Sequence, residues 1–374
     1  MATVDQLAQS QATDAMPVHG IDHLEIFAGN AAQAAFFFTR AFGFTETAYA
    51  GLETGQRDRV SHVLEQGRIR LVVTGTLGGD DEIGDHHRRH GDSVHSIALS
   101  VPDARAAYGH AVEHGARGIV VPRTLEDEHG SVVIASVGTY GEVRHTFIER
   151  NGYDGPFLPG FEARAEADRG PDGLLAGIDH VVGNVELGHM EEWVGYYERV
   201  FGMTEMIHFS DDDISTEYSA LMSKVVTDGS GRLKFPINEP AEGKRKSQIE
   251  EYLEFHNGPG VQHVAVATTD IVGTVAELRH RGVEFLTIPD SYYEEIPDRI
   301  GEIEEDLRDL REQGILVDRD DEGYLLQIFT KPLGDRPTLF FEVIERHGSR
   351  GFGEGNFKAL FEAIEREQDR RGNL

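Results

Sequence analysis

The chain has 374 residues, enough for two domains with separate cores, and it combines a formal net charge of −31 with a complete absence of cysteine. The charge argues against nucleic acid or an anionic membrane as a partner, because both would be repelled. The lack of cysteine excludes disulfides and cysteine-ligated metal sites, and it fits a cytoplasmic protein. No segment approaches the roughly 18 consecutive apolar residues of a membrane span.

The sequence of the first half predicts two units, each with one helix and several strands. Residues 1–17 lack the pattern of a signal peptide and are expected to form a tail. Hydrophobic periodicity and turn residues predict the first unit as a strand at 21–28, a helix at 31–41 and strands at 60–64 and 68–74. They predict the second as a strand at 94–101, a helix at 103–114 and strands at 131–137 and 142–149.

The second half predicts the same order of elements after a linker at 153–176, which contains Pro156, Pro159 and Pro171. The predicted elements are a strand at 178–185, a helix at 189–201, strands at 216–224, 233–237 and 261–267, a helix between Asp270 and Gly282, and strands at 324–330 and 338–344. Two further amphipathic helices, at 300–313 and 356–370, have no counterpart in the first half.

Two short sequences recur between the halves. Ile21-Asp22-His23 returns as Ile178-Asp179-His180, and Phe42-Gly43 as Phe201-Gly202, at offsets of 157 and 159 residues. A nearly constant offset indicates duplication. We therefore predict an α+β fold of two tandem domains, 18–152 and 177–374. Each would be built from duplicated βαβββ units that form a curved, half-closed mixed sheet.

Three side chains of the second half are candidate metal ligands. His180 and His263 each lie within the leading strand of a unit, and Glu342 lies within Leu-Phe-Phe-Glu-Val-Ile. A lone histidine in a strand is more often a core residue, but a carboxylate among apolar strand residues is costly to bury unless it is paired or bound to a metal. Two imidazoles and one carboxylate leave three positions free, as in non-heme Fe(II) oxygenases. Zinc would accept the same ligands and would favour hydrolase-like or isomerase-like chemistry.

The first half retains only one of these ligands. In an alignment of the halves His23 corresponds to His180, whereas Ser96 and Thr146 stand in place of His263 and Glu342. We therefore predict no metal site there and a structural role for His23.

A second group of histidines, His86, His87 and His90, lies in an acidic, glycine-containing segment. Such a segment is either a metal-binding cluster or a surface loop, and the loop is the expected structure.

Several short segments of the second half are distinctive in combination. They are Asp-His-Val-Val-Gly-Asn-Val at 179–185, Glu-Tyr-Ser-Ala-Leu at 217–221, Pro-Ile-Asn-Glu-Pro at 236–240, Gly-Val-Gln-His-Val at 260–264, Leu-Leu-Gln-Ile-Phe-Thr-Lys-Pro at 325–332, Phe-Phe-Glu at 340–342 and Gly-Phe-Gly-Glu-Gly-Asn-Phe-Lys-Ala-Leu-Phe at 351–361. Through them the chain, from about residue 18 onward, resembles the 4-hydroxyphenylpyruvate dioxygenases of the vicinal oxygen chelate superfamily.

The resemblance implies one Fe(II) per chain, held by His180, His263 and Glu342. It also implies a set of substrate-binding residues: Ser223, Asn238 and Gln248 at the phenol and ring, Gln262 and Gln327 beside the iron, Phe329 and Phe357 on the two faces of the ring, Phe352 in the wall, and Asn356 as an anchor of the closing helix. Without the resemblance, the aromatic residues among them would be read as core and Asn238 as a turn residue. The glycines at 351, 353 and 355 lack the spacing of a phosphate loop and predict a tight connection into the last helix.

The activity implied by the resemblance is the conversion of 4-hydroxyphenylpyruvate and O2 to homogentisate and CO2, in tyrosine and phenylalanine catabolism. The reaction comprises oxidative decarboxylation, ring hydroxylation and side-chain migration, with no separate protein acid or base and with the C-terminal helix as a lid. A cytoplasmic homo-oligomer, a dimer or a tetramer, is implied as well. Two alternatives remain: 4-hydroxymandelate synthase, with the same ligands, and a non-catalytic small-molecule binder of the superfamily.

Overall fold

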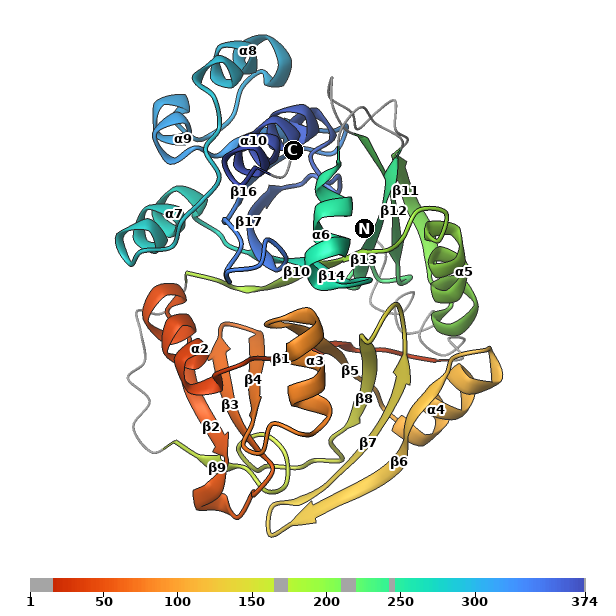
Figure 1. Cartoon of the computed structure of the whole chain (residues 1–374). Coiled ribbons are helices and arrows are strands. Elements are labelled where there is room, and N and C mark those ends of the chain that lie inside the picture. Colours follow the sequence, from red (N-terminus) through yellow and green to blue (C-terminus); the bar gives the residue numbers. More distant parts are fainter. Residues whose placement is uncertain (1–15, 165–173, 210–219, 242–245, 373–374) are drawn as a thin grey trace.

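The structure is a computed structural model that describes residues 16–164, 174–209, 220–241 and 246–372. It contains two strongly curled mixed sheets, one from each half of the chain (Figure 1). The first sheet has the strand order β6 (Gly118–Asp127), β7 (Gly130–Gly138), β8 (Arg144–Glu149), β5 (Ser93–Ser100), β1 (Gly20–Phe27), β4 (Ile69–Thr76), β3 (Arg59–Gln66), β2 (Thr45–Ala50) and β9 (Glu162–Ala163). The second has the order β11 (Thr204–Phe209), β12 (Ala220–Thr227), β13 (Lys234–Ala241), β10 (Gly177–Asn184), β14 (Gly260–Ala267), β17 (Phe340–His347), β16 (Tyr324–Phe329) and β15 (Leu316–Arg319).

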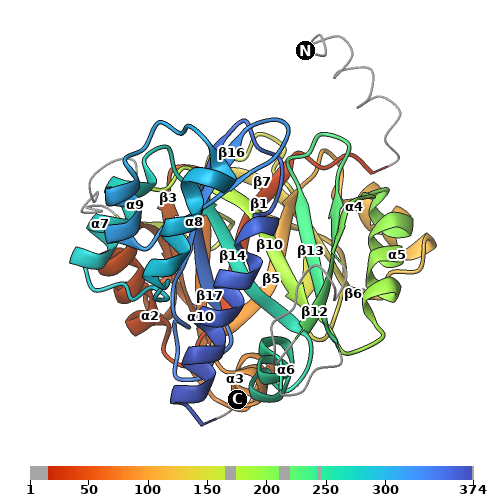
Figure 2. The same ribbon diagram turned by 90° about the horizontal axis from the view of Figure 1, so that it is seen from above.

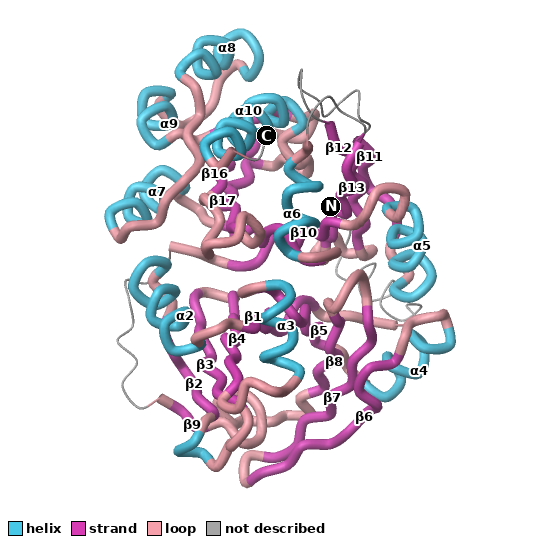
Figure 3. The backbone as a smooth tube through the Cα atoms, in the orientation of Figure 1, coloured by secondary structure: helices cyan, strands magenta, loops and turns pink. Residues whose placement is uncertain are grey.

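Helices lie around both sheets (Figure 3). Those of the first half are α2 (Ala31–Phe37), α3 (Glu82–His90) and α4 (Ala104–Glu113). Those of the second half are α5 (Met190–Phe201), α6 (Gln248–His256), α7 (Ile271–His280), α8 (Asp290–Ile300), α9 (Leu307–Gln313) and α10 (Phe357–Arg370). Figure 2 shows α10 crossing the open side of the second sheet, in front of β14 and β17. Within the described parts of the chain, no helix is long and apolar enough to cross a membrane.

The strand registers confirm the predicted duplicated α+β fold. In the first sheet β1 pairs with β5 antiparallel and with β4 parallel, and in the second sheet β10 pairs in the same way with β14 and β13. His23 lies opposite Ala98, as His180 lies opposite Ala265. A register shift immediately precedes each of these histidines, so even the irregularity is repeated.

Local sequence signals account for the helix boundaries that were predicted correctly. Asp103 caps α4 by accepting hydrogen bonds from two backbone N–H groups of the first turn, and Asp270 caps α7. The helix predicted at 31–41 is α2 continued by a π-helical turn at Phe38–Phe42, which Gly43 ends with a φ of 79°.

Five expectations differ from the structure or lie partly outside it. The single helix predicted at 300–313 is wrong: Gly301, with a φ of 74°, ends α8, and Asp306 caps a separate α9. The loop expected around His86 is also wrong, because this segment is the helix α3, capped by Asp81 and partly buried. The predicted tail, the middle of the linker (165–173) and the start of the strand at 216–224 lie outside the described residues, whereas residues 162–163 form β9 and pair with β2.

The two halves share a continuous apolar core and a buried polar contact. The Tyr197 hydroxyl of α5 lies 2.9 Å from Nε2 of His145 in β8, while Nδ1 of His145 faces the backbone oxygen of Ile97 at 3.3 Å. A carbonyl oxygen only accepts, so Nδ1 carries the hydrogen and Nε2 accepts from the tyrosine. Burial lowers the pKa of His145 to about 4, so the ring is neutral at pH 7.

This neutral histidine predicts that acid weakens the folded state. The unfolded chain binds a proton below its ordinary pKa of about 6.5, whereas folded His145 does so only near 4. Stability is therefore lost as the pH falls between these values. Relative to His145→Gln, the free energy of unfolding of the wild type should fall by about 2 kcal/mol between pH 7 and pH 5. Urea unfolding of both proteins at both pH values tests this, and a difference independent of pH would contradict it.

Candidate active site

The structure brings the three predicted metal ligands together in the second sheet. His180 of β10 and Glu342 of β17 both lie opposite Ala265 of the intervening strand β14, and His263 lies two residues before Ala265. Because side chains alternate between the faces of a strand, this register places all three on one face. Glu342 Oε2 lies 3.1 Å from Nε2 of His180 and 3.4 Å from Nε2 of His263. The three groups are 3–8 % exposed.

Hydrogen bonds behind the two imidazoles orient them as metal ligands. Nδ1 of His180 donates to Asp179 Oδ1 at 2.8 Å, and Nδ1 of His263 donates to Gln262 Oε1 at 2.9 Å. A carboxylate and an amide oxygen can only accept, so each Nδ1 carries the hydrogen. The lone pairs of both Nε2 atoms are then directed to the side of Glu342, where a metal ion would take them up.

The electrostatics favour the forms of these groups that bind a metal. Burial alone would raise the pKa of Glu342, but His180 and His263 outweigh it and lower that pKa to about 2, so the carboxylate is ionised. Burial lowers the pKa of His263, which is therefore neutral at pH 7. In His180 burial is outweighed by Glu342 and Asp179, and its pKa is raised, so a metal ion entering here competes with a proton.

The candidate ligands form one end of a partly open cavity between the second sheet and α10, which encloses about 610 Å³ when the solvent at its open side is included. Its mainly apolar and aromatic lining suits a small aromatic ligand. The residues that line it and were also predicted as substrate contacts are Ser223, Asn238, Gln248, Gln262, Gln327, Phe329, Phe352 and Phe357. Asn356 does not line the cavity. It is fully buried beside it and accepts hydrogen bonds from Tyr292 at 2.6 Å and Arg299 at 3.3 Å, so it connects the start of α10 to α8.

Aromatic rings surround the ligands. Phe352 packs edge-on against His180 with ring centroids 5.0 Å apart, and Phe329 lies 5.9 Å from His263 in a similar arrangement. Phe340 stacks on His263 at 4.8 Å. The rings limit the access of water to the ligands, which strengthens electrostatic interactions there.

Sequence reasoning missed a group of apolar lining residues: Val182, Phe209, Leu221, Val225, Pro236, Phe340, Leu360, Phe361 and Ile364. For Leu360, Phe361 and Ile364 the helical spacing in α10 showed that one face is buried. It did not show that this face covers a cavity. One signal could have identified Phe340 as a lining residue: it lies two residues before the predicted ligand Glu342, on the same face of β17.

The equivalent position in the first sheet has no such set of ligands. Thr146 lies opposite Ala98, as Glu342 lies opposite Ala265. The Thr146 hydroxyl is hydrogen-bonded to the hydroxyls of Ser96 at 2.8 Å and Ser136 at 3.0 Å. His23 keeps its hydrogen bond to Asp22 at 2.7 Å and packs edge-on against Phe157. Both copies thus keep an aspartate that accepts a hydrogen bond from the histidine, whereas the first copy lacks the other two candidate ligands.

Comparisons with known proteins identify relatives of this chain. The family model described as Glyoxalase/Bleomycin resistance protein/Dioxygenase superfamily matches residues 20–142 and 177–328. The 4-hydroxyphenylpyruvate dioxygenase of Yarrowia lipolytica is 47% identical over 95% of this chain and 93% of its own length. That of Dictyostelium discoideum is 48% identical over 96% of this chain and 100% of its own length.

A solved structure is similar over nearly the whole chain. A triple mutant of 4-hydroxymandelate synthase from Streptomyces coelicolor superimposes with a TM-score of 0.84 at 36% identity, covering 94% of this chain and 100% of the other. The sequence identities to the dioxygenases are higher and equally extensive. The chain therefore belongs to the 4-hydroxyphenylpyruvate dioxygenase family, within the Glyoxalase/Bleomycin resistance protein/Dioxygenase superfamily.

Proposed function

We propose that the protein converts 4-hydroxyphenylpyruvate and O2 to homogentisate and CO2, with one Fe(II) per chain held by His180, His263 and Glu342. The observation that carries this proposal is the buried set of two imidazoles and one carboxylate at the end of an aromatic-lined cavity. A bound Fe(II) would supply the activation of O2 and the oxidation of the substrate, chemistry that no side chain provides. Family membership supports the choice of substrate.

The residues of the cavity would bind the substrate and exclude water. The 2-oxo acid would lie at the metal end beside Gln327, whose Oε1 is buried without a hydrogen-bond partner among the described residues. The phenol would lie at the other end, near Ser223, Asn238 and Gln248. Asn238 donates from Nδ2 to Asn184 at 3.3 Å, which leaves its oxygen free to accept from the phenol. No protein group is assigned as a separate acid or base.

Phe329 and Phe357 would hold the ring between them, with Phe357 fixed edge-on against Phe209 at 4.9 Å. Phe357→Ala should therefore raise KM by about 10-fold, because a buried aromatic contact contributes roughly 1.5 kcal/mol or more. Steady-state kinetics with 4-hydroxyphenylpyruvate measure it. Val112→Ala, an exposed residue of α4 far from the cavity, is the control and should leave KM unchanged. An unaltered KM in Phe357→Ala would remove this residue from the site.

The main alternative is 4-hydroxymandelate synthase, which the solved structure with a TM-score of 0.84 favours as a second candidate. The ligands do not separate the two activities, since the position of the ring relative to the metal decides which carbon is hydroxylated. We favour the dioxygenase because the segment at 351–361 that carries Phe352 and Phe357 is intact.

Product analysis tests the proposal directly. The chain, supplied with Fe(II), ascorbate, O2 and 4-hydroxyphenylpyruvate, should yield homogentisate by chromatography and release one CO2 per O2 consumed. Formation of 4-hydroxymandelate would overturn the assignment in favour of the alternative. A protein that binds the substrate but consumes no O2 after Fe(II) is added would be a non-catalytic binder.

We further propose that residues 18–152 form a structural domain and 177–374 the catalytic domain of a cytoplasmic homo-oligomer, a dimer or a tetramer. The set formed by His180, His263 and Glu342 on the second sheet supports the division of roles. Membership of the family supports oligomerisation, and the absence of cysteine supports a reducing compartment.

A further inference from the structure

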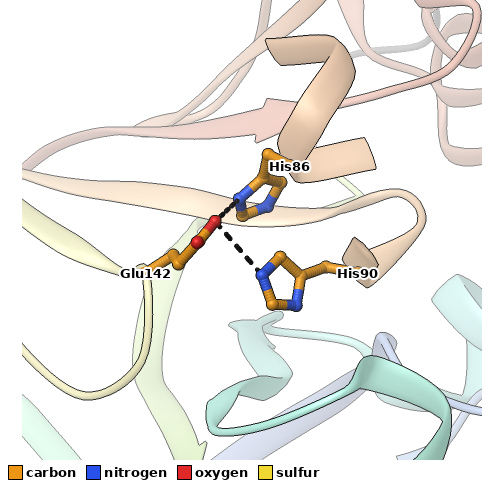
Figure 4. A group of neighbouring side chains, drawn as sticks. All are labelled: His86, His90 and Glu142. Atoms are coloured by element: carbon orange, nitrogen blue, oxygen red, sulfur yellow. Dashed lines mark hydrogen bonds and ion pairs between the residues drawn. The ribbon is translucent and has the colours of Figure 1, made fainter. Parts of the chain in front are cut away.

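A second cluster of two histidines and a carboxylate lies in the first half, away from the cavity. His86 and His90 project from successive turns of α3, and Glu142 comes from the turn between β7 and β8 (Figure 4). Oε2 of Glu142 lies 3.1 Å from Nδ1 of His86 and 3.2 Å from Nε2 of His90. Both imidazoles are at most 4 % exposed. Neither the catalytic site nor the core explains why three such groups converge here.

The hydrogen bonds of His90 leave a buried lone pair that needs a cation. Nδ1 of His90 lies 2.6 Å from the backbone oxygen of His256 in α6, and because a carbonyl only accepts, Nδ1 carries the hydrogen. In the neutral ring Nε2 then has a lone pair, which faces the negative oxygen of Glu142. Nε2 is buried and has no hydrogen-bond partner among the described residues, although Oε2 of Glu142 lies only 3.2 Å away. A metal ion between the two would bind both atoms.

His86 is arranged as a second ligand. Its Nε2 lies 2.8 Å from the Ser93 hydroxyl, which can accept the ring hydrogen and so leave the lone pair of Nδ1 facing Glu142. With its hydrogen on Nε2, the neutral ring presents Nδ1 in the form that binds metals. Arg89 contacts the other oxygen, Oε1, of Glu142 and leaves Oε2 to the cluster.

The cluster has the dimensions of the proposed iron site. In that site the carboxylate oxygen lies 3.1 and 3.4 Å from the two imidazole nitrogens, against 3.1 and 3.2 Å here. Metal–ligand bonds of 2.0–2.1 Å in tetrahedral geometry place neighbouring ligand atoms about 3.3 Å apart. The side chain of Glu142 is 33% exposed, so an ion can enter from its side.

A further buried polar group adjoins the cluster. The ring of His95 lies 4.8 Å from that of His86, and both of its nitrogens are buried without a hydrogen-bond partner in the described parts of the chain. The nearest charge is Glu82 Oε1, 3.8 Å from Nε2. Such a group is costly unless it interacts with something polar. A metal ion bound at the cluster, or a water molecule bound to that ion, would provide this interaction.

We propose that His86, His90 and Glu142 bind a second divalent transition-metal ion, of which zinc fits best. Two imidazoles and one carboxylate suit zinc and disfavour calcium and magnesium, which prefer oxygen ligands. The ion would fix His90, which contacts the second half: its Nδ1 bonds to the backbone oxygen of His256 in α6, and its ring stacks on that of His256 at 4.4 Å. Its role is structural, because none of the three ligands lines the catalytic cavity.

Zinc stoichiometry tests the proposal. The full chain, freed of metal by a chelator and then dialysed against Zn²⁺, should bind two ions per chain, since zinc also occupies the ligands at His180. Glu142→Gln should bind one ion while retaining its circular dichroism, and its thermal transition should no longer respond to the second equivalent of Zn²⁺. Glu82→Gln is the matched control. It removes a neighbouring carboxylate of α3 that pairs with Arg144, and it should still bind two.

A second variant tests metal binding by the cluster without altering any of its residues. Glu342→Gln leaves the cluster intact and should bind one Co²⁺ per chain, with visible absorption bands that are absent from the double variant Glu142→Gln/Glu342→Gln. If Glu342→Gln binds no Co²⁺, or if the wild type and Glu142→Gln bind equal numbers of Zn²⁺, the cluster is an ordinary ion pair and the proposal is wrong.

Discussion

Replacing His263 by alanine should abolish O2 consumption with 4-hydroxyphenylpyruvate while the protein stays folded. The substitution leaves one imidazole and one carboxylate, too few ligands to hold Fe(II) at working concentrations. Loss of a residue behind a metal ligand already costs about 10- to 100-fold in affinity or activity, so the loss of the ligand itself should exceed roughly 100-fold. An oxygen electrode measures the rate, and metal analysis of the same sample measures iron.

The duplication provides the control for this experiment. Ser96 occupies the position of His263 in the first sheet and is equally buried in a strand. Ser96→Ala should therefore keep wild-type activity and iron content, although it loses the hydrogen bond to Thr146. Circular dichroism and thermal unfolding should show both variants folded. Wild-type O2 consumption by His263→Ala would exclude this residue as a ligand.

Replacing Arg346 by methionine should weaken both the fold and the binding of iron. Arg346 donates two hydrogen bonds to Asp179, at 2.8 and 2.9 Å, and Asp179 in turn orients His180. Burial would raise the pKa of Asp179, but His180 and Arg346 outweigh it and lower that pKa strongly. Without Arg346 the buried carboxylate keeps, among the described residues, only Lys234, at 2.9 Å, as a cationic partner besides His180. We expect the free energy of unfolding to fall by about 3 kcal/mol and iron affinity to fall by about 10- to 100-fold.

The first half contains the same arrangement at His23, where Ser96 and Thr146 replace the other two candidate ligands, and this separates the two effects. Arg150 donates to Asp22 at 2.8 and 2.9 Å, and Asp22 accepts from His23. Arg150→Met should therefore lose a similar amount of stability, about 3 kcal/mol, and bind iron as the wild type does. Urea unfolding and equilibrium dialysis with Fe(II) under anaerobic conditions measure the two quantities. Equal iron affinities in the two variants would show that Asp179 does not support the metal site.

Much of this fold could be predicted because the signals are local. Asp103 and Asp270 cap helices through hydrogen bonds within one turn, and the apolar spacing of α10 follows from the helical period. Elements with weaker local signals were missed. The largely exposed strand β6 lacks an apolar face. The sequence predicts a loop for the helix α3, whose last five residues are histidine or arginine, because its stability comes from packing against β1, β4 and α6.

The candidate metal ligands were also within reach of the sequence, for a reason specific to this chain. A carboxylate within an apolar strand is costly to bury without a partner. Comparison of the two copies showed that His23 lacks the two partners that His180 keeps. The same reasoning failed for His86 and His90, which lie on one helix, because their third partner, Glu142, comes from a turn more than 50 residues away in the chain. The contribution of Phe340 and the separation of Asn356 from the cavity were equally hidden.

The sequence by itself thus determined the duplicated architecture, the candidate set His180, His263 and Glu342 that the first copy lacks, and, through its short motifs, the resemblance to the family. Only the tertiary structure decided how these side chains meet. The register of three adjacent strands placed His180, His263 and Glu342 on one face, and the crossing of α10 closed a cavity over them. The packing of α3 against the turn between β7 and β8 created the second cluster. Contacts between distant segments depend on strand register and on the packing of whole elements, and no local pattern encodes either.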